Sequence, residues 1–174
     1  MLASLLLASS VATPWLSDDA SPGRGQVANE PRWVLSSGVS SLSGKADGAA
    51  FGFEYRWPHE RDPWWGIEEL APIAGVLATT EGSLYAYGGW RYDWDVGSPW
   101  RVTPSLSAGL YEQGDGFDLG HAIEFRSSVE LSRSIGETTR LGLTFFHLSN
   151  AGLSSRNPGT NGLTLNISWS PGAD

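Results

Sequence analysis

The sequence predicts an all-β protein, an eight-stranded antiparallel transmembrane β-barrel. From Trp33 onward, apolar and polar residues alternate with a period of two, as in strands with one apolar and one polar face. Turn residues divide this alternation into eight runs. The 174-residue chain contains 22 Gly, 9 Trp and 17% charged residues, which suits a sheet with many tight turns better than a helical bundle.

Two segments precede the expected barrel. Residues 1–12 contain a short apolar run that ends at a small-x-small site where a signal peptidase could cut, but they lack a basic start. We therefore expect an export signal there, either complete or truncated at its start; the alternative is a disordered apolar tail. Residues 13–31 are rich in Pro, Ser, Asp and Gly and are expected to form a linker. The barrel is expected to cover residues 32–171.

The eight runs are the expected strands. They cover residues 33–42, 50–57, 65–78, 83–94, 100–112, 121–134, 138–149 and 162–170. A short polar turn around His59 is expected between the second and third strands. Tight turns near Gly97 and Gly136 contrast with longer polar loops at 112–120 and 150–161. Such an alternation is typical of outer-membrane barrels, whose short turns lie on the periplasmic side.

The charged residues indicate which face is the interior. They lie on the polar faces of several strands, where they could pair inside a narrow lumen: Glu54, Arg56, Arg91, Arg101, Glu124, Arg126 and Glu130. A soluble lipid-carrying barrel would have the opposite arrangement, and the alternation alone does not separate the two. Tryptophans and tyrosines near the strand ends favour the membrane, because they match aromatic girdles at both interfaces. We therefore expect the protein in the bacterial outer membrane.

Several other functions are disfavoured by composition. The formal net charge of -8 argues against a nucleic-acid partner, which would require a basic surface. The absence of cysteine excludes disulfides, thiolate zinc sites and cysteine nucleophiles. Three scattered histidines match no metal-binding spacing, and no phosphate loop or dinucleotide fingerprint occurs. No metal and no cofactor are therefore expected.

One strand ends in a histidine and a serine two positions apart. His147 and Ser149 continue the face of run 138–149 that carries Leu143 and Phe145. Residues i and i+2 of a strand project from the same side about 6.5–7 Å apart, a span that two converging side chains can close to a hydrogen bond. A polar pair on a lipid-facing stripe is costly away from the interface. The alternative is that these strand-end residues merely reach the headgroup layer.

The surrounding sequence resembles a known enzyme family. The stretch HLSNAGLSSRNPG, residues 147–159, resembles the H-x-S-N-A-G-L motif and the following N-P-G or N-D-G turn of PagL-type lipid A 3-O-deacylases, the outer-membrane acyloxyacyl hydrolases. Residues 104–120, PSLSAGLYEQGDGFDLG, and the two strands after them resemble the family's fifth to seventh strands. The resemblance covers about the last third of the chain.

The resemblance implies an activity and residue roles. An eight-stranded barrel of this family removes the ester-linked 3-hydroxyacyl chain at position 3 of lipid A, using a Ser-His-Glu arrangement on its outer surface. Ser149 would be the nucleophile and His147 its general base. The side-chain amide of Asn150 and the backbone N–H of Gly152 would hold the oxyanion.

The family's acidic position is occupied here by Asn161. This residue is on the outward face of the last strand, and hairpin pairing would bring it roughly opposite His147 or Ser149. An amide oxygen can accept the imidazole N–H, although it stabilises an imidazolium less than a carboxylate does. Alternatively, Asp118 or His121 fills the role, or the activity is weakened or lost.

The sequence thus predicts an outer-membrane esterase that acts on lipid A, with lipopolysaccharide and outer-membrane lipids as its partners. A catalytically silent structural or adhesive barrel is the main alternative. The oligomeric state stays open, with a homodimer among the options, as does the acyl-chain preference.

Overall fold

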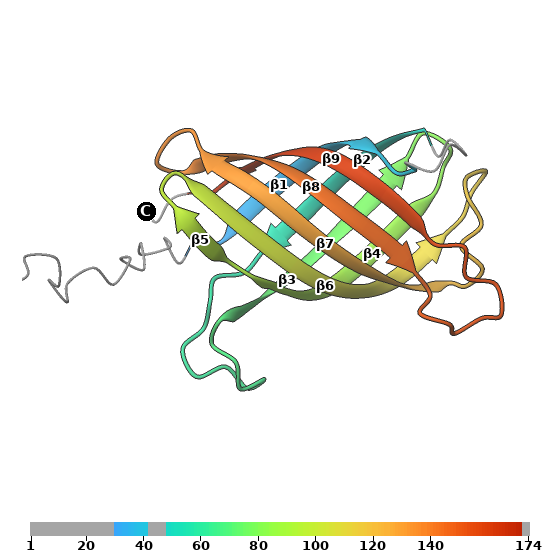
Figure 1. Ribbon diagram of the computed structural model, residues 1–174, viewed down its shortest axis with the longest axis horizontal. Helices are drawn as coiled ribbons and strands as arrows, with labels where there is room; N and C mark the ends of the chain where they lie inside the picture. The colour runs from blue at the N-terminus through green and yellow to red at the C-terminus, as the bar shows by residue number, and fades with distance from the viewer. Residues whose placement is uncertain (1–29, 42–47, 172–174) are drawn as a thin grey trace, which may run out of the picture.

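The computed structural model describes residues 30–41 and 48–171, which form one antiparallel sheet closed into a barrel (Figure 1). Its strands are β1 (Arg32–Val39), β2 (Ala49–Arg56), β3 (Leu70–Thr79), β4 (Leu84–Tyr92), β5 (Trp94–Gly97), β6 (Trp100–Glu112), β7 (Ile123–Ser134), β8 (Thr139–Ser149) and β9 (Thr160–Trp169). The sheet runs β4-β3-β2-β1-β9-β8-β7-β6-β5, and pairing of β4 with β6 closes it. The predicted signal peptide and the linker up to residue 29 lie outside the described residues.

The predicted eight-stranded antiparallel barrel is confirmed. The expected fourth strand is interrupted at Asp93, after which the short β5 continues beside β6, where Trp94 pairs with Val102. When β4 and β5 are counted together as one strand, the described residues form an eight-stranded barrel in which each strand is hydrogen-bonded to two neighbours. No helix within them could cross a membrane.

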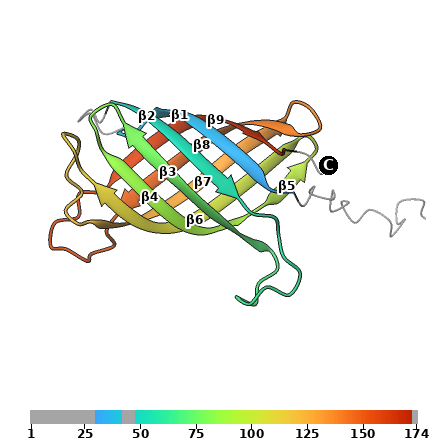
Figure 2. The same ribbon diagram turned by 180° about the vertical axis from the view of Figure 1, so that it is seen from behind.

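The connection between β2 and β3 is longer than predicted. Strand β3 begins at Leu70 instead of residue 65, so His59 lies in an extended loop, residues 57–69, and not in a short turn. This loop extends away from the barrel wall (Figures 1 and 2). Pro63 accepts a hydrogen bond from Gly66 N at 2.8 Å in a local turn that ends the expected pairing, and a proline has no N–H to donate to a ladder.

The barrel has two chemically different ends. We call the end that holds Arg32 and Trp169 the terminal end and the opposite one, where β8 ends, the distal end (Figure 1). The tryptophans expected in two girdles all lie at the terminal end: Trp33, Trp57, Trp64, Trp65, Trp94, Trp100 and Trp169. The expectation of two tryptophan girdles was therefore wrong. Consecutive strands run in opposite directions, so a tryptophan that ends one strand and one that starts the next lie at the same end.

The two faces of the wall are as predicted for a membrane barrel. Large apolar side chains such as Leu106, Val129 and Leu165 are exposed on the outside, whereas Glu54, Arg126 and other charged residues are buried in the lumen. A soluble lipid-carrying barrel would have the reverse arrangement. The structure therefore excludes that alternative and has the arrangement of a transmembrane barrel.

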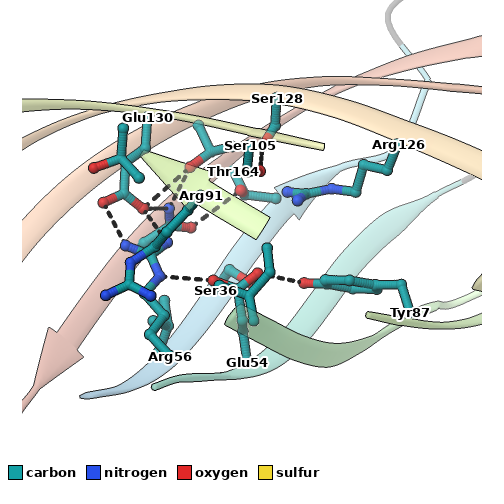
Figure 3. A pocket seen from close by; sticks show the side chains of 15 residues that line it. Ser36, Glu54, Arg56, Tyr87, Arg91, Ser105, Arg126, Ser128, Glu130 and Thr164 are labelled. Atoms are coloured by element: carbon teal, nitrogen blue, oxygen red, sulfur yellow. Dashed lines mark hydrogen bonds and ion pairs between the residues drawn. The ribbon is translucent and has the colours of Figure 1, made fainter. Parts of the chain in front are cut away.

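A network of ion pairs and hydrogen bonds crosses the lumen (Figure 3). Arg56 of β2 donates to both carboxylate oxygens of Glu130 on β7, at 3.1 and 2.9 Å, and to Glu54 at 2.7 Å. Asn166 of β9 donates to Glu130 at 2.7 Å, and Tyr87 of β4 donates to Glu54 at 2.8 Å. Because these residues come from strands on different sides of the barrel, the network ties opposite walls together.

Apolar side chains fill the distal end of the lumen. We call them the distal plug: Ala50, Leu77, Tyr85, Leu119, Phe146 and Leu148, all buried. Leu119 comes from the β6–β7 loop, and Phe146 and Leu148 are among the last residues of β8. Phe146 lies against Gly162 of β9, where a Cβ atom would be 2.1 Å from the phenyl Cζ. The glycine therefore makes room for the ring that anchors the end of β8.

Substitution Glu130→Ala is expected to lower the free energy of unfolding by about 3 kcal/mol, because it leaves the Arg56 guanidinium buried with only part of its partners. Urea unfolding of the detergent-refolded barrel measures this loss. The control Glu112→Ala removes an exposed carboxylate and should change stability by no more than about 0.5 kcal/mol. Equal stability of the two variants would show that the network does not hold the barrel together.

Candidate active site

The end of β8 presents His147 and Ser149 to the outside of the barrel. Phe146 and Leu148, the residues between and before them, are buried in the distal plug. Since side chains alternate along a strand, His147 and Ser149 share the outward face with the exposed Phe145. Both are partly buried, as expected at the edge of an apolar wall. The predicted outward placement of the pair is confirmed.

Asn161 lies where the sequence predicted it. In the β8–β9 ladder it is directly opposite His147, and its Oδ1 atom lies 2.9 Å from His147 Nδ1. With Nδ1–H donating to this amide oxygen, the lone pair is on Nε2, the nitrogen that a general base uses. Asn161 therefore orients the imidazole in the position that an acidic residue has in a Ser-His-Glu arrangement.

Ser149 is on the same face as His147 and two residues farther along the strand. It is opposite Phe125 of β7 in the ladder. Within the described part of the chain, no hydrogen bond joins Ser149 to His147. Hydrogen bonds between catalytic groups are commonly long without substrate and tighten when it binds. The spacing allows the two side chains to converge by a change of rotamer.

Asn150 begins the tight turn that follows the strand. Ala151 and Gly152 both have positive φ, 52° and 84°, and Leu153 N donates to Asn150 O at 3.0 Å. These features define a type I′ turn over residues 150–153. The Asn150 side chain is fully buried; its Nδ2 donates to Leu119 O at 3.0 Å and to Arg156 O at 2.8 Å. Asn150 therefore holds the β6–β7 and β8–β9 loops together.

This arrangement uses the hydrogen atoms that were predicted to bind the oxyanion. Both Nδ2 hydrogens of Asn150 are donated to backbone carbonyls, and Gly152 N donates to Asn150 Oδ1 at 3.0 Å. Neither residue has an N–H left for a ligand unless the loop rearranges. Their role in oxyanion binding stays a prediction, and their role in the structure is to shape the loop. Since Asn150 Oδ1 accepts from the backbone N–H two residues on, this residue forms an Asx turn, a common use of asparagine in turns.

The two alternative partners for His147 are engaged elsewhere. Asp118 forms an ion pair with Arg156 and accepts a hydrogen bond from Gly120 N at 2.8 Å. His121 Nδ1 accepts a hydrogen bond from Ile123 N at 2.9 Å. Both residues hold the β6–β7 loop, and Asn161 is the residue that contacts the imidazole.

Gly159 is a site residue that sequence reasoning did not single out. Its φ is +59°, and a Cβ atom at this position would lie 2.9 Å from His147 Cε1. Any other residue would be strained in this conformation and would also displace the imidazole. The N-P-G turn was the available signal, since a glycine that ends such a turn commonly has positive φ.

The site thus combines a hydroxyl, an imidazole and an amide acceptor on an apolar outer wall. Such a set can activate a serine for attack on an ester. Among residues 30–41 and 48–171, no group of three or more potential metal ligands occurs. The acyl part of a lipid can lie against the exposed apolar side chains beside the pair, such as Phe145.

The sequence matches a known family of outer-membrane enzymes. The family model described as PagL, lipid A 3-O-deacylase, matches residues 46–170. The lipid A deacylase PagL of Bordetella bronchiseptica is 25% identical over 122 residues, which are 65% of this chain and 68% of that protein.

Solved structures agree with the fold. A crystal structure of the outer membrane enzyme PagL superposes with a TM-score of 0.60 and 19% identity, over 79% of this chain and 98% of that one. The crystal structure of Neisserial surface protein A has a TM-score of 0.53 and 12% identity, over 82% of this chain and 97% of that one. At these identities the likeness concerns the barrel fold.

Substitution Asn150→Ala is expected to loosen the loop at residues 150–159, because it leaves Leu119 O and Arg156 O without their donors. The expected cost is about 1–3 kcal/mol. Limited proteolysis should cleave this loop faster in the variant, whereas Ser155→Ala, which changes an exposed serine of the same loop, should not alter cleavage. Unchanged protection in Asn150→Ala would contradict the structural role of this amide.

Proposed function

Given that the chain belongs to the PagL family of lipid A 3-O-deacylases, we propose that it is an outer-membrane esterase that uses Ser149 and His147. The observation that carries this proposal is the outward-facing His147, which is hydrogen-bonded to Asn161 and shares its face with Ser149. The bond to be cleaved is the ester that links a 3-hydroxyacyl chain to position 3 of lipid A.

The proposed reaction has two halves. Ser149 Oγ attacks the ester carbonyl carbon while His147 takes the hydroxyl proton, and the resulting imidazolium returns that proton to the sugar oxygen as the C–O bond breaks. The acyl chain is then bound to Ser149. A water molecule then attacks the acyl carbonyl carbon while the same imidazole takes one of its protons. The imidazolium returns this proton to Ser149 Oγ as the bond between Oγ and the acyl carbon breaks, which releases a free 3-hydroxy fatty acid and restores the serine.

Asn161 has the role of a positioning residue. By accepting from Nδ1 it fixes the tautomer in which His147 can receive a proton, and it limits rotation of the ring. Its neutral amide stabilises the imidazolium less than a carboxylate does. We therefore expect a functional enzyme that is slower than its Asn161→Glu variant. The oxyanion roles of Asn150 and Gly152 are part of the proposal only if substrate rearranges the loop.

The location of the site supports a lipid substrate in the outer leaflet. His147 and Ser149 lie at the distal end, opposite the end at which the chain enters and leaves the barrel (Figure 1). In barrels of this class short turns are on the periplasmic side. The terminal end carries the two short turns at 98–99 and 135–138, although the long 57–69 connection is also at this end. The distal end then reaches the outer leaflet, where lipid A is found, and the ester would lie at the headgroup boundary with its chain against the wall.

Mass spectrometry of lipid A from cells that produce the protein tests the proposal. Wild-type protein should remove the mass of one 3-hydroxyacyl chain, Ser149→Ala should abolish this loss, and His147→Ala should reduce it by about 10²–10⁴-fold. Ser155→Ala, an exposed serine of the neighbouring loop, is the matched control and should act like the wild type. Full activity in Ser149→Ala would refute the serine mechanism.

A catalytically silent barrel is the second candidate, and the neutral Asn161 is the observation that favours it. Unchanged lipid A in the presence of folded, membrane-inserted wild-type protein would support it. Recovery of activity in Asn161→Glu would then identify the missing carboxylate as the cause.

Variants at position 161 separate the effect of orienting the His147 ring from the effect of a negative charge beside it. Asn161→Asp keeps the oxygen acceptor and adds a charge, so the deacylation rate should rise by about tenfold, equivalent to about 1.4 kcal/mol in the barrier. Asn161→Leu removes the acceptor and should lower the rate below that of the wild type. Initial rates on purified lipid A in detergent measure both effects. Equal rates in all three proteins would show that this residue does not act on His147.

A further inference from the structure

The loop between β2 and β3 carries a strongly exposed tryptophan. We call residues 57–69 the lateral loop. The Trp64 side chain is 86% exposed, the highest value among the exposed large apolar side chains of the described residues, and Ile67 is 49% exposed. Trp64 makes an edge-on ring contact with Trp65, with the ring centroids 5.7 Å apart. Apolar surface that stays exposed in a folded chain commonly marks a place where another molecule binds.

The exposure of Trp64 follows from the local structure of the loop. Gly66 N donates to Pro63 O at 2.8 Å, and Gly66 has a φ of +79°, a conformation that strains other residues. The Trp65 indole donates to Ile67 O at 2.9 Å, which turns this ring back onto the loop backbone. The loop therefore displays Trp64 and Ile67 from a hydrogen-bonded turn.

The base of the lateral loop is bound to the lumen of the barrel. Trp57 N, at the start of the loop, donates to Pro72 O of β3 at 3.1 Å. Arg91 is buried inside the barrel, and its Nη1 donates to Trp57 O at 2.9 Å and to Pro72 O at 3.1 Å. The same guanidinium pairs with Asp93 at 3.1 Å. One buried arginine thus joins the two strands that carry the loop, so the direction in which the loop leaves the barrel is defined.

The lateral loop leaves the barrel sideways. In both views it projects from the terminal end across the long axis of the barrel, and it does not reach beyond the tight turns at that end (Figures 1 and 2). A membrane barrel crosses the bilayer along its axis. A loop that projects sideways at one end therefore lies along the membrane surface, whereas a loop that reached into the aqueous compartment would extend beyond the strand ends.

The lateral loop continues the aromatic surface of the terminal end. The ring of Trp57 lies 4.7 Å from that of Tyr55, and the ring of Tyr55 lies 4.4 Å from that of Trp33 on β1. Tryptophan and tyrosine are the residues that gather at the level of the lipid headgroups. The exposed Trp64 extends this aromatic surface from the barrel wall onto the loop.

The charges of the lateral loop limit how deep it lies and which lipid it meets. Its acidic residues, all exposed, outnumber its one arginine: Glu60, Asp62, Glu68 and Glu69 against Arg61. Ionised side chains are costly in hydrocarbon, so the loop must stay at the headgroup level. A net negative segment is repelled by anionic lipid, but its carboxylates can pair with the ammonium groups of zwitterionic headgroups.

We propose that the lateral loop is a lipid-binding arm that rests on a zwitterionic phospholipid surface at the terminal end, with Trp64 and Ile67 inserted between the headgroups. The inference goes beyond the esterase and does not depend on it. Segments that lie on such a surface bury their apolar side chains about 5–10 Å into the headgroup boundary. The arm resists movement of the barrel along the membrane normal and so helps to hold the distal end at the opposite surface.

Spin-label depth measurements test the arm. The chain has no cysteine, so a single nitroxide can be attached in Ile67→Cys. The refolded protein is placed in phosphatidylcholine vesicles at a low protein-to-lipid ratio, with no other protein present. The label should be accessible to oxygen and protected from a neutral water-soluble nickel complex, as in Leu165→Cys on the outer wall. The matched control Ser155→Cys, in the exposed part of the β8–β9 loop, should be open to nickel.

Two results would overturn the proposal. Nickel access in Ile67→Cys equal to that in Ser155→Cys would show that the loop is in water and leave its apolar surface to a protein partner. Protection that appears only at a high protein-to-lipid ratio would assign the surface to a second copy of this chain.

The role of the tryptophan is tested in the same labelled protein. Trp64→Ala should cost the Ile67→Cys label its protection from nickel, because the larger apolar side chain no longer holds the loop among the headgroups. Trp94→Ala removes an exposed tryptophan of the wall at the same end and should leave the protection unchanged. Protection in Leu165→Cys versions of both variants shows that the barrel is inserted. Unchanged protection of the Ile67→Cys label in Trp64→Ala would contradict the anchoring role.

The lipid class is tested by vesicle composition. Replacing part of the phosphatidylcholine with an anionic phospholipid should reduce protection of the Ile67→Cys label, because the acidic loop is repelled. The double substitution Glu68→Gln and Glu69→Gln should restore the protection. Equal or greater protection of the unsubstituted loop in anionic vesicles would refute the zwitterionic surface.

Discussion

The structure depends on one constraint, which is that every strand separates hydrocarbon from a polar lumen. Most of the charged side chains that are buried inside have partners there, of which the Arg56–Glu130 pair is the central one. Glu124 is an exception among the described residues, because neither of its carboxylate oxygens has a hydrogen-bond partner. A slip of one residue in any ladder would turn that strand's charges toward the lipid and its apolar side chains inward. The register of β8 is thus set over its whole length, and this register places His147 and Ser149 on the outside.

The inside of the barrel also supports the site on its outside. Phe146 and Leu148 alternate with His147 and Ser149, the proposed catalytic pair, and are packed in the distal plug together with Leu119. Asn150, the next residue, binds the backbone of both neighbouring loops. The end of β8 is therefore held by the distal plug inside the lumen and by the two loops that Asn150 joins. These contacts give a surface site the rigidity that catalytic geometry requires. A site on a membrane-facing wall has no enclosing pocket, so this support is its main source of preorganisation.

Much of the barrel and of the site could be predicted, because side chains alternate along a strand and residues with odd or with even numbers therefore share a face. The period of two predicted the strands and the polar lumen. The odd numbering of Asn161 and hairpin pairing placed it roughly opposite His147 or Ser149, and the ladder pairs it with His147. What could not be predicted were properties that depend on how loops meet. The side-chain amide of Asn150 donates to the backbone oxygens of Leu119, which is distant in sequence, and of Arg156, which lies in an irregular loop. Neither contact has a sequence pattern that would reveal it. The length of the 57–69 connection could not be predicted because its apolar residues continue the pattern of β3, whereas local backbone turns at residues 63–66 and 67–70 take the place of strand pairing.

The amide at position 161 has a physical rationale in its surroundings. A carboxylate on the outer wall would be costly to keep ionised next to hydrocarbon, whereas an amide offers the same acceptor geometry at a smaller desolvation cost. In the proposed mechanism, the amide holds the imidazole in the correct tautomer before the reaction but contributes little once the imidazolium forms. Orientation and transition-state stabilisation, which a carboxylate supplies together, are therefore separated here.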